Sequence, residues 1–340
     1  MYFTLPVIKD YQRKLYLILA LLLAGCIIVS MLFYRDLHPS RASEQRPRML
    51  YKTTNNVTKK KPSPRYSVCV IFKQRLGNNM FQYASSFGIA ASKSMSLTIS
   101  KKGEFQKIFK VSALFRSDSF IETHCVKRHE KHASAYDEDL VDFANNNNYA
   151  LMMYLQSWKY FIKEEKALRK EFTFTEKVQI KRDKVISTIL RKHNHTSQND
   201  VTFIGIHIRR SDRPQPNRRS QRTFATAAYL NQSVHHFLSK HLTNTIFLVC
   251  SSRIDWSRRN MPKNIAVEYI TGNSAAVDLA ILGSCDHMIS TTGTFGWWAG
   301  WLTGGEVVYF KWPAREGTEY RQVFDANYTD FFYPGWVGFQ

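Results

Sequence analysis

The chain has 340 residues, and its 48 Lys and Arg against 27 Asp and Glu give a formal net charge of +21. Hydrophobic residues make up 44% of the chain, enough for a buried core, so a wholly disordered protein is excluded. With only 15 Gly and 5 Cys, collagen-like proteins and small disulfide scaffolds are excluded as well. The length predicts two domains with additional segments.

The first feature in chain order is an apolar run over residues 15–34, which contains no charged residue. Because about 20 helical residues cross the hydrocarbon core of a bilayer, we predict a transmembrane helix at 15–34, a cytoplasmic tail at 1–14 and a stem at 35–66. A cleaved signal peptide has a shorter apolar core, and the lipid-attachment pattern ending at Cys26 is followed by further apolar residues. An uncleaved membrane anchor is therefore favoured over both alternatives.

Four N-x-S/T triplets follow this run, at Asn56, Asn194, Asn231 and Asn327. Such triplets are acceptors of N-glycosylation in secreted chains. We therefore expect the bulk of the chain to lie in the secretory lumen, as in a single-pass type II membrane protein.

The predicted stem explains part of the positive charge, because residues 35–65 contain nine basic and only two acidic residues. Basic runs of this kind are usually solvated, so we expect no nucleic-acid partner. The remaining surplus of Arg and Lys suits an anionic substrate. A non-enzymatic membrane protein that binds polyanions is the alternative explanation of the charge.

Four cysteines follow the apolar run, at Cys69, Cys125, Cys250 and Cys285. They allow three complete pairings, among which the sequence does not choose. None has the C-x-x-C spacing of a zinc site, so we expect no structural zinc.

From Ser67 onward the pattern alternates between short apolar runs and helical periodicity. Predicted strands lie at 68–72, 201–208, 245–251, 288–291 and 307–310, and predicted helices at 227–238, 275–282 and from Met80 onward. This alternation predicts parallel sheets covered by helices, in two α/β domains at 67–199 and 200–340.

The clearest candidate site is the segment from His207 to Asp212, at the end of a predicted strand. Side chains alternate across a strand, so His207 and Arg209 are expected on one side and Arg210 on the other. Ligands of open α/β sheets bind beyond the carboxyl ends of the strands, where guanidinium groups suit phosphate oxygens. The alternative is a salt bridge among surface charges, with Asp212 as the acid.

A second candidate is the loop from Gln74 to Asn79, between a predicted strand and the next helix. Gly77 permits a tight turn, Asn78 is a favoured helix cap, and amides at a helix start attract anions. Arg75 would add a positive charge to this loop. An ordinary strand-to-helix turn has the same pattern.

The third candidate follows the strand at 288–291, where Thr292 and Thr294 flank a glycine before a helix. This arrangement is similar to a phosphate-binding turn, although the lysine of a P-loop is missing. The tryptophans at 297, 298 and 301 are expected in the core rather than on a sugar-binding surface. Asp278 stands in an apolar helix, where it either contacts a ligand or interacts with the helix dipole.

Together these segments resemble the α-1,2-fucosyltransferases of animals. The family motifs G-R-L-G-N-Q-M-x-Q-Y-A, H-V-R-R-G-D and T-x-G-T-F-G-x-W-A-A-Y-L-x-G-G match residues 74–84, 207–212 and 291–305 in this order. A fourth, Y-F-Q-S-W-x-Y-F, matches 154–161. The chain departs from the family pattern at Gln74, Asn79 and Ser211, among other positions.

The resemblance implies two Rossmann-like domains facing across a cleft, a GT-B-like arrangement, with the acceptor on the first domain and GDP-fucose on the second. It implies a Golgi membrane enzyme that needs no metal. Arg209 would contact the β-phosphate, and His207 and Asp278 the guanosine. The other implied donor contacts are Arg75, Gly77 and Asn78 in the first loop, and Thr294 and Phe295 at the diphosphate and base.

We therefore expect transfer of L-fucose from GDP-fucose to the 2-hydroxyl of a galactose in a glycan, with inversion at the anomeric carbon. Arg209, helped by Arg210, would stabilise the departing diphosphate, and Asp212 is the candidate general base. A fucosyltransferase acting on a protein or an N-glycan core is the alternative with the same donor site.

Overall fold

The computed structural model describes residues 64–210, 221–240 and 244–340. The predicted cytoplasmic tail, transmembrane helix and nearly all of the stem lie outside the described residues, as do Asn56 and Asp212. Within the described ranges, no helix combines the length and the apolar character that a membrane crossing requires.

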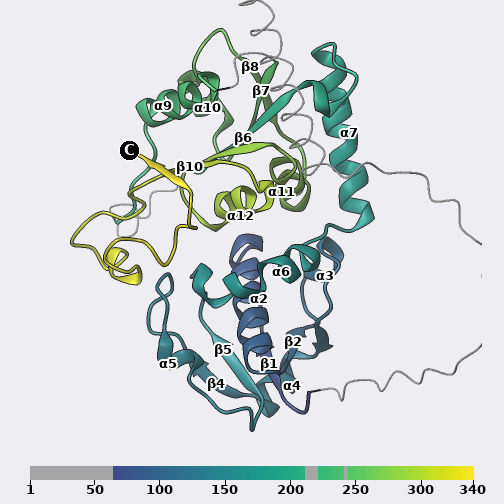
Figure 1. Ribbon diagram of the computed structural model, residues 1–340, viewed down its shortest axis with the longest axis vertical. Coiled ribbons are helices and arrows are strands. Elements are labelled where there is room, and N and C mark those ends of the chain that lie inside the picture. Colours follow the sequence, from purple (N-terminus) through teal and green to yellow (C-terminus); the bar gives the residue numbers. More distant parts are fainter. Residues whose placement is uncertain (1–63, 211–220, 241–243) are drawn as a thin grey trace, which may run out of the picture. The chain divides into compact units, whose positions relative to one another are not determined.

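The described chain forms two sheets of parallel strands (Figure 1). The strands of the first sheet are β1 (Ser67–Val70), β2 (Ser96–Ser100), β3 (Leu114–Arg116), β4 (Val126–His129) and β5 (Tyr149–Met152). Those of the second are β6 (Thr202–Ile208), β7 (Thr245–Ser251), β8 (Ala266–Ile270), β9 (His287–Ser290), β10 (Val307–Phe310) and β11 (Val337–Phe339). The predicted pair of parallel α/β domains is thus confirmed.

Helices connect these strands. The α-helices that follow strands of the first sheet are α2 (Leu76–Ser92), α3 (Phe105–Ile108), α4 (Asp118–His124), α5 (Glu138–Val141), α6 (Glu165–Glu171) and α7 (Glu176–Lys192). Those of the second sheet are α9 (Ala227–Leu238), α10 (Ile254–Asn260), α11 (Ala275–Gly283) and α12 (Thr294–Thr303). Short 3-10 helices lie at Trp158–Tyr160, Ile162–Glu164, Gln198–Asp200 and Arg321–Val323.

In each sheet, the order in which the strands are added reverses beside the first strand of that sheet. The strand orders are β3-β2-β1-β5-β4 and β11-β10-β9-β6-β7-β8, so the chain leaves β1 and β6 to one side and later returns to the other. The reversal falls between β1 and β5 in the first sheet and between β6 and β9 in the second. Ligands of open α/β sheets bind at such switch points, beyond the carboxyl ends of the strands.

The start of α2 differs from its prediction. The helix was expected from Met80, after a Gly-Asn loop, but it begins at Leu76, because the backbone N–H groups of Asn78 and Asn79 already donate to the Arg75 carbonyl. Gly77 and Asn78 therefore lie in the first helical turn. The predicted strands at 245–251 and 307–310 and the predicted helix at 227–238 have the expected bounds.

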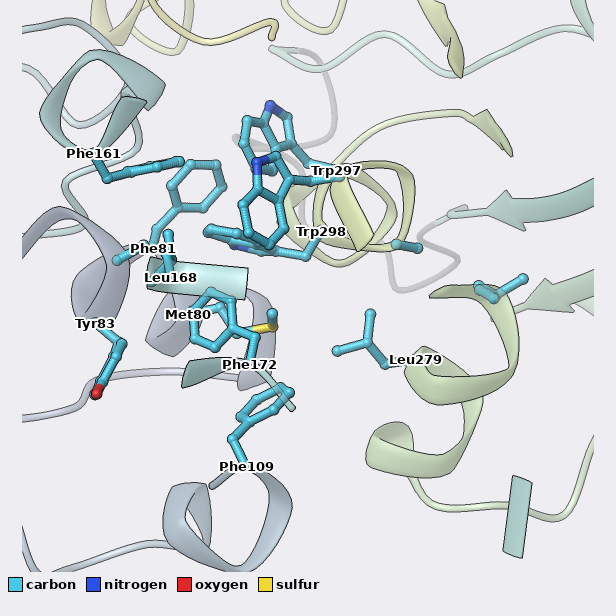
Figure 2. Close-up of a cluster of buried hydrophobic side chains, with 14 of the residues drawn as sticks. Met80, Phe81, Tyr83, Phe109, Phe161, Leu168, Phe172, Leu279, Trp297 and Trp298 are labelled. Atoms are coloured by element: carbon cyan, nitrogen blue, oxygen red, sulfur yellow. The ribbon is translucent and has the colours of Figure 1, made fainter. Parts of the chain in front are cut away.

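An aromatic core joins α2 to α12. Figure 2 shows the ring of Phe81 beside Trp297 and Trp298, with Phe161 and Phe172 around them. The ring centroids of Phe81 lie 4.6 Å from Trp297 and 4.9 Å from Trp298. Both tryptophans are buried, which confirms the prediction that they pack in the core. Since each buried aromatic side chain contributes roughly 1.5–3 kcal/mol, this core holds the two helices firmly together.

Further contacts connect segments of the two sheets. Trp158 donates from its indole N–H to the Thr329 carbonyl, and the Asp330 carboxylate accepts from the backbone N–H of Tyr136. Helix α7, which precedes β6, packs against α11 of the second sheet. The division of the chain between residues 199 and 200 stays a prediction.

The cysteines do not all pair. Cys69 and Cys125 form a disulfide that closes a loop of 56 residues between β1 and the end of α4, whereas Cys250 and Cys285 are free and buried in the second domain. The disulfide lies in a small cluster of its own with Ile121 and Ala150.

We predict that the double variant Cys69→Ala/Cys125→Ala is less stable than the wild-type protein. Opening a loop of this length typically costs about 2–4 kcal/mol, which lowers the melting temperature by several degrees. Thermal unfolding followed by circular dichroism measures the change. Dithiothreitol should lower the melting temperature of the wild-type protein and leave that of the double variant unchanged; equal melting temperatures of both proteins without reductant would contradict the prediction.

Candidate functional site

The end of strand β6 and the turn after β9 are tied together at the switch point of the second sheet. The Thr291 backbone N–H donates to the His207 carbonyl over 3.1 Å, and the Thr291 hydroxyl oxygen accepts from the Arg209 backbone N–H over 2.9 Å. These bonds set the position at which the Arg209 side chain leaves the strand.

The imidazole of His207 is neutral. Burial lowers its pKa to about 3, and the nearby positive charge of Arg209 acts in the same direction. Among the described residues, its buried Nδ1 atom has no hydrogen-bond partner. The ring of Phe295 lies 5.1 Å away, centroid to centroid. A neutral aromatic pair of this kind can contact a nucleobase but cannot neutralise a phosphate.

The side chain of Arg209 lies against the glycine turn before α12. A Cβ atom at Gly293 would come within 3.1 Å of the Arg209 Cδ atom, and the glycine has a φ of 93°, which L-residues rarely adopt. The positive φ favours glycine here, and a Cβ atom would in addition press on the Arg209 side chain. No described residue forms a hydrogen bond or ion pair with the Arg209 guanidinium.

Two further arginines act on Arg209. Lost hydration lowers its pKa, and the guanidinium groups of Arg222 and Arg75 lower it further, although an arginine stays protonated under any physiological condition. Arg222 is held in place by Tyr320, whose hydroxyl accepts from its Nη1 over 2.7 Å and whose ring centroid lies 3.8 Å from its guanidinium carbon. Sequence reasoning missed Arg222, because it belongs to no motif and only the tertiary structure brings it near Arg209.

The first turns of α2 and α12 meet directly. The side-chain oxygen of Asn78 accepts hydrogen bonds from the Thr294 hydroxyl over 2.8 Å and from the Gln156 amide over 3.2 Å. A Cβ atom at Gly77 would lie 2.7 Å from the Phe295 backbone nitrogen, so only glycine permits this approach. Two helix N-termini, each with a partial positive charge, thus converge beside the arginines, which is an arrangement that attracts anions.

The structure does not bring Arg210 into this group. Its guanidinium stacks on the Trp256 ring at 4.0 Å and donates to the Ala225 carbonyl over 3.0 Å, on the side of the strand opposite to Arg209. The second guanidinium near Arg209 is therefore not its neighbour in sequence. Asp212, the candidate base, lies outside the described residues.

Asp278 and Thr292 lie at the same edge of the second sheet. Asp278 is in the first turn of α11, accepts from the Asn273 amide over 3.2 Å, and has a pKa raised by burial. Its charge reaches the thiol of Cys250, in the strand next to β6. No described hydrogen bond or ion pair joins it to His207 or Arg209. Thr292 is buried in the turn between β9 and α12.

The remaining predicted sites are also placed. Asn194, Asn231 and Asn327 are exposed, but Asn231 lies on helix α9 and the serine of its triplet, Ser233, is fully buried. A glycan on Asn194 or Asn327 fits the folded surface better. In the described part of the chain, no group of three or more His, Cys, Asp or Glu residues is arranged to hold a metal ion.

Comparison with known proteins adds to this geometry. The model of glycosyl transferase family 11 matches residues 39–340. Galactoside alpha-(1,2)-fucosyltransferase 1 of Oryctolagus cuniculus is 30% identical over 187 residues, which cover 54% of this chain and 49% of that protein. The chain thus matches about half the length of this curated relative.

Solved structures are similar at lower identity. POFUT1 in complex with GDP-fucose aligns with a TM-score of 0.45 and 12% identity over 73% of this chain and 96% of that chain. A mutant of Arabidopsis thaliana FUT1 in complex with GDP aligns with a TM-score of 0.49 and 12% identity over 73% of this chain and 70% of that chain. Because the family model covers most of the chain, this protein belongs to glycosyl transferase family 11.

Proposed function

We propose that this protein transfers L-fucose from GDP-fucose to the 2-hydroxyl of a galactose residue in a glycan. Membership of glycosyl transferase family 11 and the name of its curated relative support the reaction class. The observation that carries the proposal is the Arg209 guanidinium, which has no described counter-ion and lies beside two converging helix N-termini. A diphosphate supplies the missing negative charge.

The parts of the donor would divide between the elements around the switch point. The diphosphate would lie between the first turn of α12 and the side chain of Arg209, with Arg222 and Arg75 adding positive charge. The guanine would lie near the neutral ring of His207 and near Phe295. Planar guanidinium groups hold phosphate oxygens through paired hydrogen bonds, so several arginines favour a nucleotide diphosphate over a neutral sugar.

In the reaction, a lone pair of the acceptor oxygen forms the new bond to the anomeric carbon of fucose, on the face opposite to the departing diphosphate. The bond from that carbon to the β-phosphate oxygen breaks, and its electron pair stays on the phosphate. Arg209 stabilises this growing charge, and fixed donors of this kind typically contribute several kcal/mol in the transition state. The hydroxyl proton passes to a base, for which Asp212 is our candidate.

The acceptor and the cellular setting are parts of the same proposal. We assign the acceptor to the first domain, at its switch point between β1 and β5. Asn78 follows β1, Gln156 follows β5, and their side chains are hydrogen-bonded to each other. The apolar run at 15–34 would anchor the enzyme in the Golgi membrane with its catalytic part in the lumen. No metal ion takes part, because arginines supply the charge that a divalent cation supplies elsewhere.

The proposal is tested by incubating the full chain with radiolabelled GDP-fucose and lactose, N-glycan core and protein acceptors in parallel. We expect labelled lactose, fucosylated at the galactose 2-hydroxyl, and undiminished turnover in EDTA. Calorimetry should detect GDP-fucose and GDP but not UDP-sugars. Transfer to the other acceptors alone would correct the acceptor class, and heparin binding without GDP binding would favour the polyanion-binding alternative.

Arg209→Ala should reduce turnover by about a hundredfold or more, because the departing diphosphate loses its nearest charge. Affinity for GDP should fall more than affinity for guanosine, which lacks phosphates. Steady-state kinetics and calorimetry measure the two effects. Arg259→Ala, at an exposed arginine of α10, is the matched control and should behave as wild type. Near-normal turnover of a folded Arg209→Ala protein would refute the mechanism.

The burial of His207 predicts a loss of stability in acid. The unfolded imidazole takes up a proton near pH 6.5, but the folded one does so only near pH 3. The unfolded state thus binds more protons between these values, and stability falls as the pH drops through this window. Replacing the titrating ring in His207→Gln should make the melting temperature less dependent on pH between 7 and 4. Parallel melting curves of both proteins across that range would contradict the lowered pKa.

A further inference from the structure

The carboxyl edge of the first sheet contains a concentration of unusual backbone conformations. Among the described residues, five non-glycine residues other than asparagine have positive φ, and three of them lie here. They are Gln74 (77°) after β1, and Met153 (88°) and Leu155 (56°) after β5. A positive φ is unfavourable for such side chains, and strain of this kind is common at ligand-binding sites.

A buried glutamine holds the two strained loops together. Gln82 on α2 is only 2% exposed. Its side-chain oxygen accepts from the Lys73 backbone N–H over 3.1 Å, and its amide donates to the Met153 carbonyl over 2.7 Å. The fully buried Ser85, one turn further along α2, donates to the Leu155 carbonyl over 2.7 Å. Through these side-chain hydrogen bonds, helix α2 holds both the loop after β1 and the loop after β5 in place.

A buried carboxyl group completes this support. Glu130 is 5% exposed, and its Oε2 accepts from the Leu155 backbone N–H over 2.9 Å, while its buried Oε1 has no partner among the described residues. Burial raises its pKa to about 8. A buried carboxyl group is costly, and here its described bonds serve mainly to hold the chain between Met153 and Leu155.

The turn supported in this way presents side chains to solvent. Met153 is 42% exposed, although it is large and apolar, and Tyr154 is partly exposed next to it. The following Gln156 bonds to Asn78, which bonds to Thr294 at the start of α12. Met153 and Tyr154 thus precede by only three and two residues the Gln156 side chain, which is bonded through Asn78 to the junction where the donor would lie.

We propose that Met153 and Tyr154 form the subsite for the pyranose ring of the acceptor glycan; this inference rests on the proposed function. One face of a galactose ring is lined with C–H groups, which suit a thioether and a phenol ring, while the exposed Gln74 can bond to hydroxyl groups. The position fits, because it is the switch point of the first sheet. Gln82 and Glu130 are positioning residues, which hold the turn without touching the sugar.

The test compares the acceptor kinetics of variants of the full chain. Met153→Ala and Tyr154→Ala should each raise the KM for lactose about tenfold, because each removes apolar contact with the sugar. The Kd for GDP should stay unchanged. Leu114→Ala is the matched control, since Leu114 is a 47% exposed apolar residue on β3 of the same sheet. If wild type transfers fucose and both variants keep the wild-type KM, the subsite is overturned and the proposed function stands.

A binding measurement separates failure of the subsite from failure of the reaction. In protein labelled with ¹³C-methyl methionine, with GDP present, lactose should shift the Met153 signal, assigned through Met153→Leu. A shift without any fucose transfer would support the subsite and reject the proposed function. An unchanged Met153 signal at saturating lactose overturns the subsite in either case.

The positioning role of Glu130 is tested by the same kinetics. Glu130→Ala removes the acceptor for the Leu155 N–H and should raise the KM for lactose, with the Kd for GDP unchanged. Glu130→Gln keeps a side-chain oxygen there and should restore the KM. Melting temperatures establish that both variants are folded. A Glu130→Ala protein that is folded and has the wild-type KM would exclude the role.

Discussion

The site depends on the direct contact between the first turns of α2 and α12. The Asn78 side chain joins them through the Thr294 hydroxyl, and the absence of a Cβ atom at Gly77 lets the two backbones approach. The aromatic core around Phe81 and Trp298 holds the same helices together behind this contact. Two partially positive helix ends repel each other. The aromatic core and, in our proposal, a bound anion stabilise the arrangement against this repulsion.

The charges around this contact follow the same logic. Arg209 has no described acid beside it, while Arg222 and Arg75 lower its pKa. Arginines that served stability alone would be paired, as Arg169 is with Glu165 on α6. In our proposal, the guanidinium groups of Arg209, Arg222 and Arg75 instead bind an anion that the protein itself does not contain.

The candidate site of the first domain is held in place by a different kind of interaction. It is a strained turn, which hydrogen bonds from Gln82, Ser85 and Glu130 hold in place. Conformational strain and a buried carboxyl group both cost free energy, which packing elsewhere in the domain must offset. In our proposals, the two switch points bind different ligands: a charged one beside α12 and a neutral one beside Met153.

The sequence alone determined the parallel strands, the two α/β domains and the family motifs, because buried parallel strands are continuous apolar runs and the motifs are contiguous. It placed Arg209 and Arg210 on opposite sides of the strand, since strand alternation is a local property, but it also expected Arg210 to assist Arg209, whereas Arg210 contacts Trp256 and Ala225 instead. Only the tertiary structure decided the start of α2 at Leu76, the disulfide between Cys69 and Cys125, and the place of Arg222 beside Arg209. The disulfide and the place of Arg222 depend on segments that are distant in the chain, and no local pattern encodes which distant surfaces meet. The start of α2 depends on the local hydrogen bonds to the Arg75 carbonyl, which a Gly-Asn sequence permits but does not require.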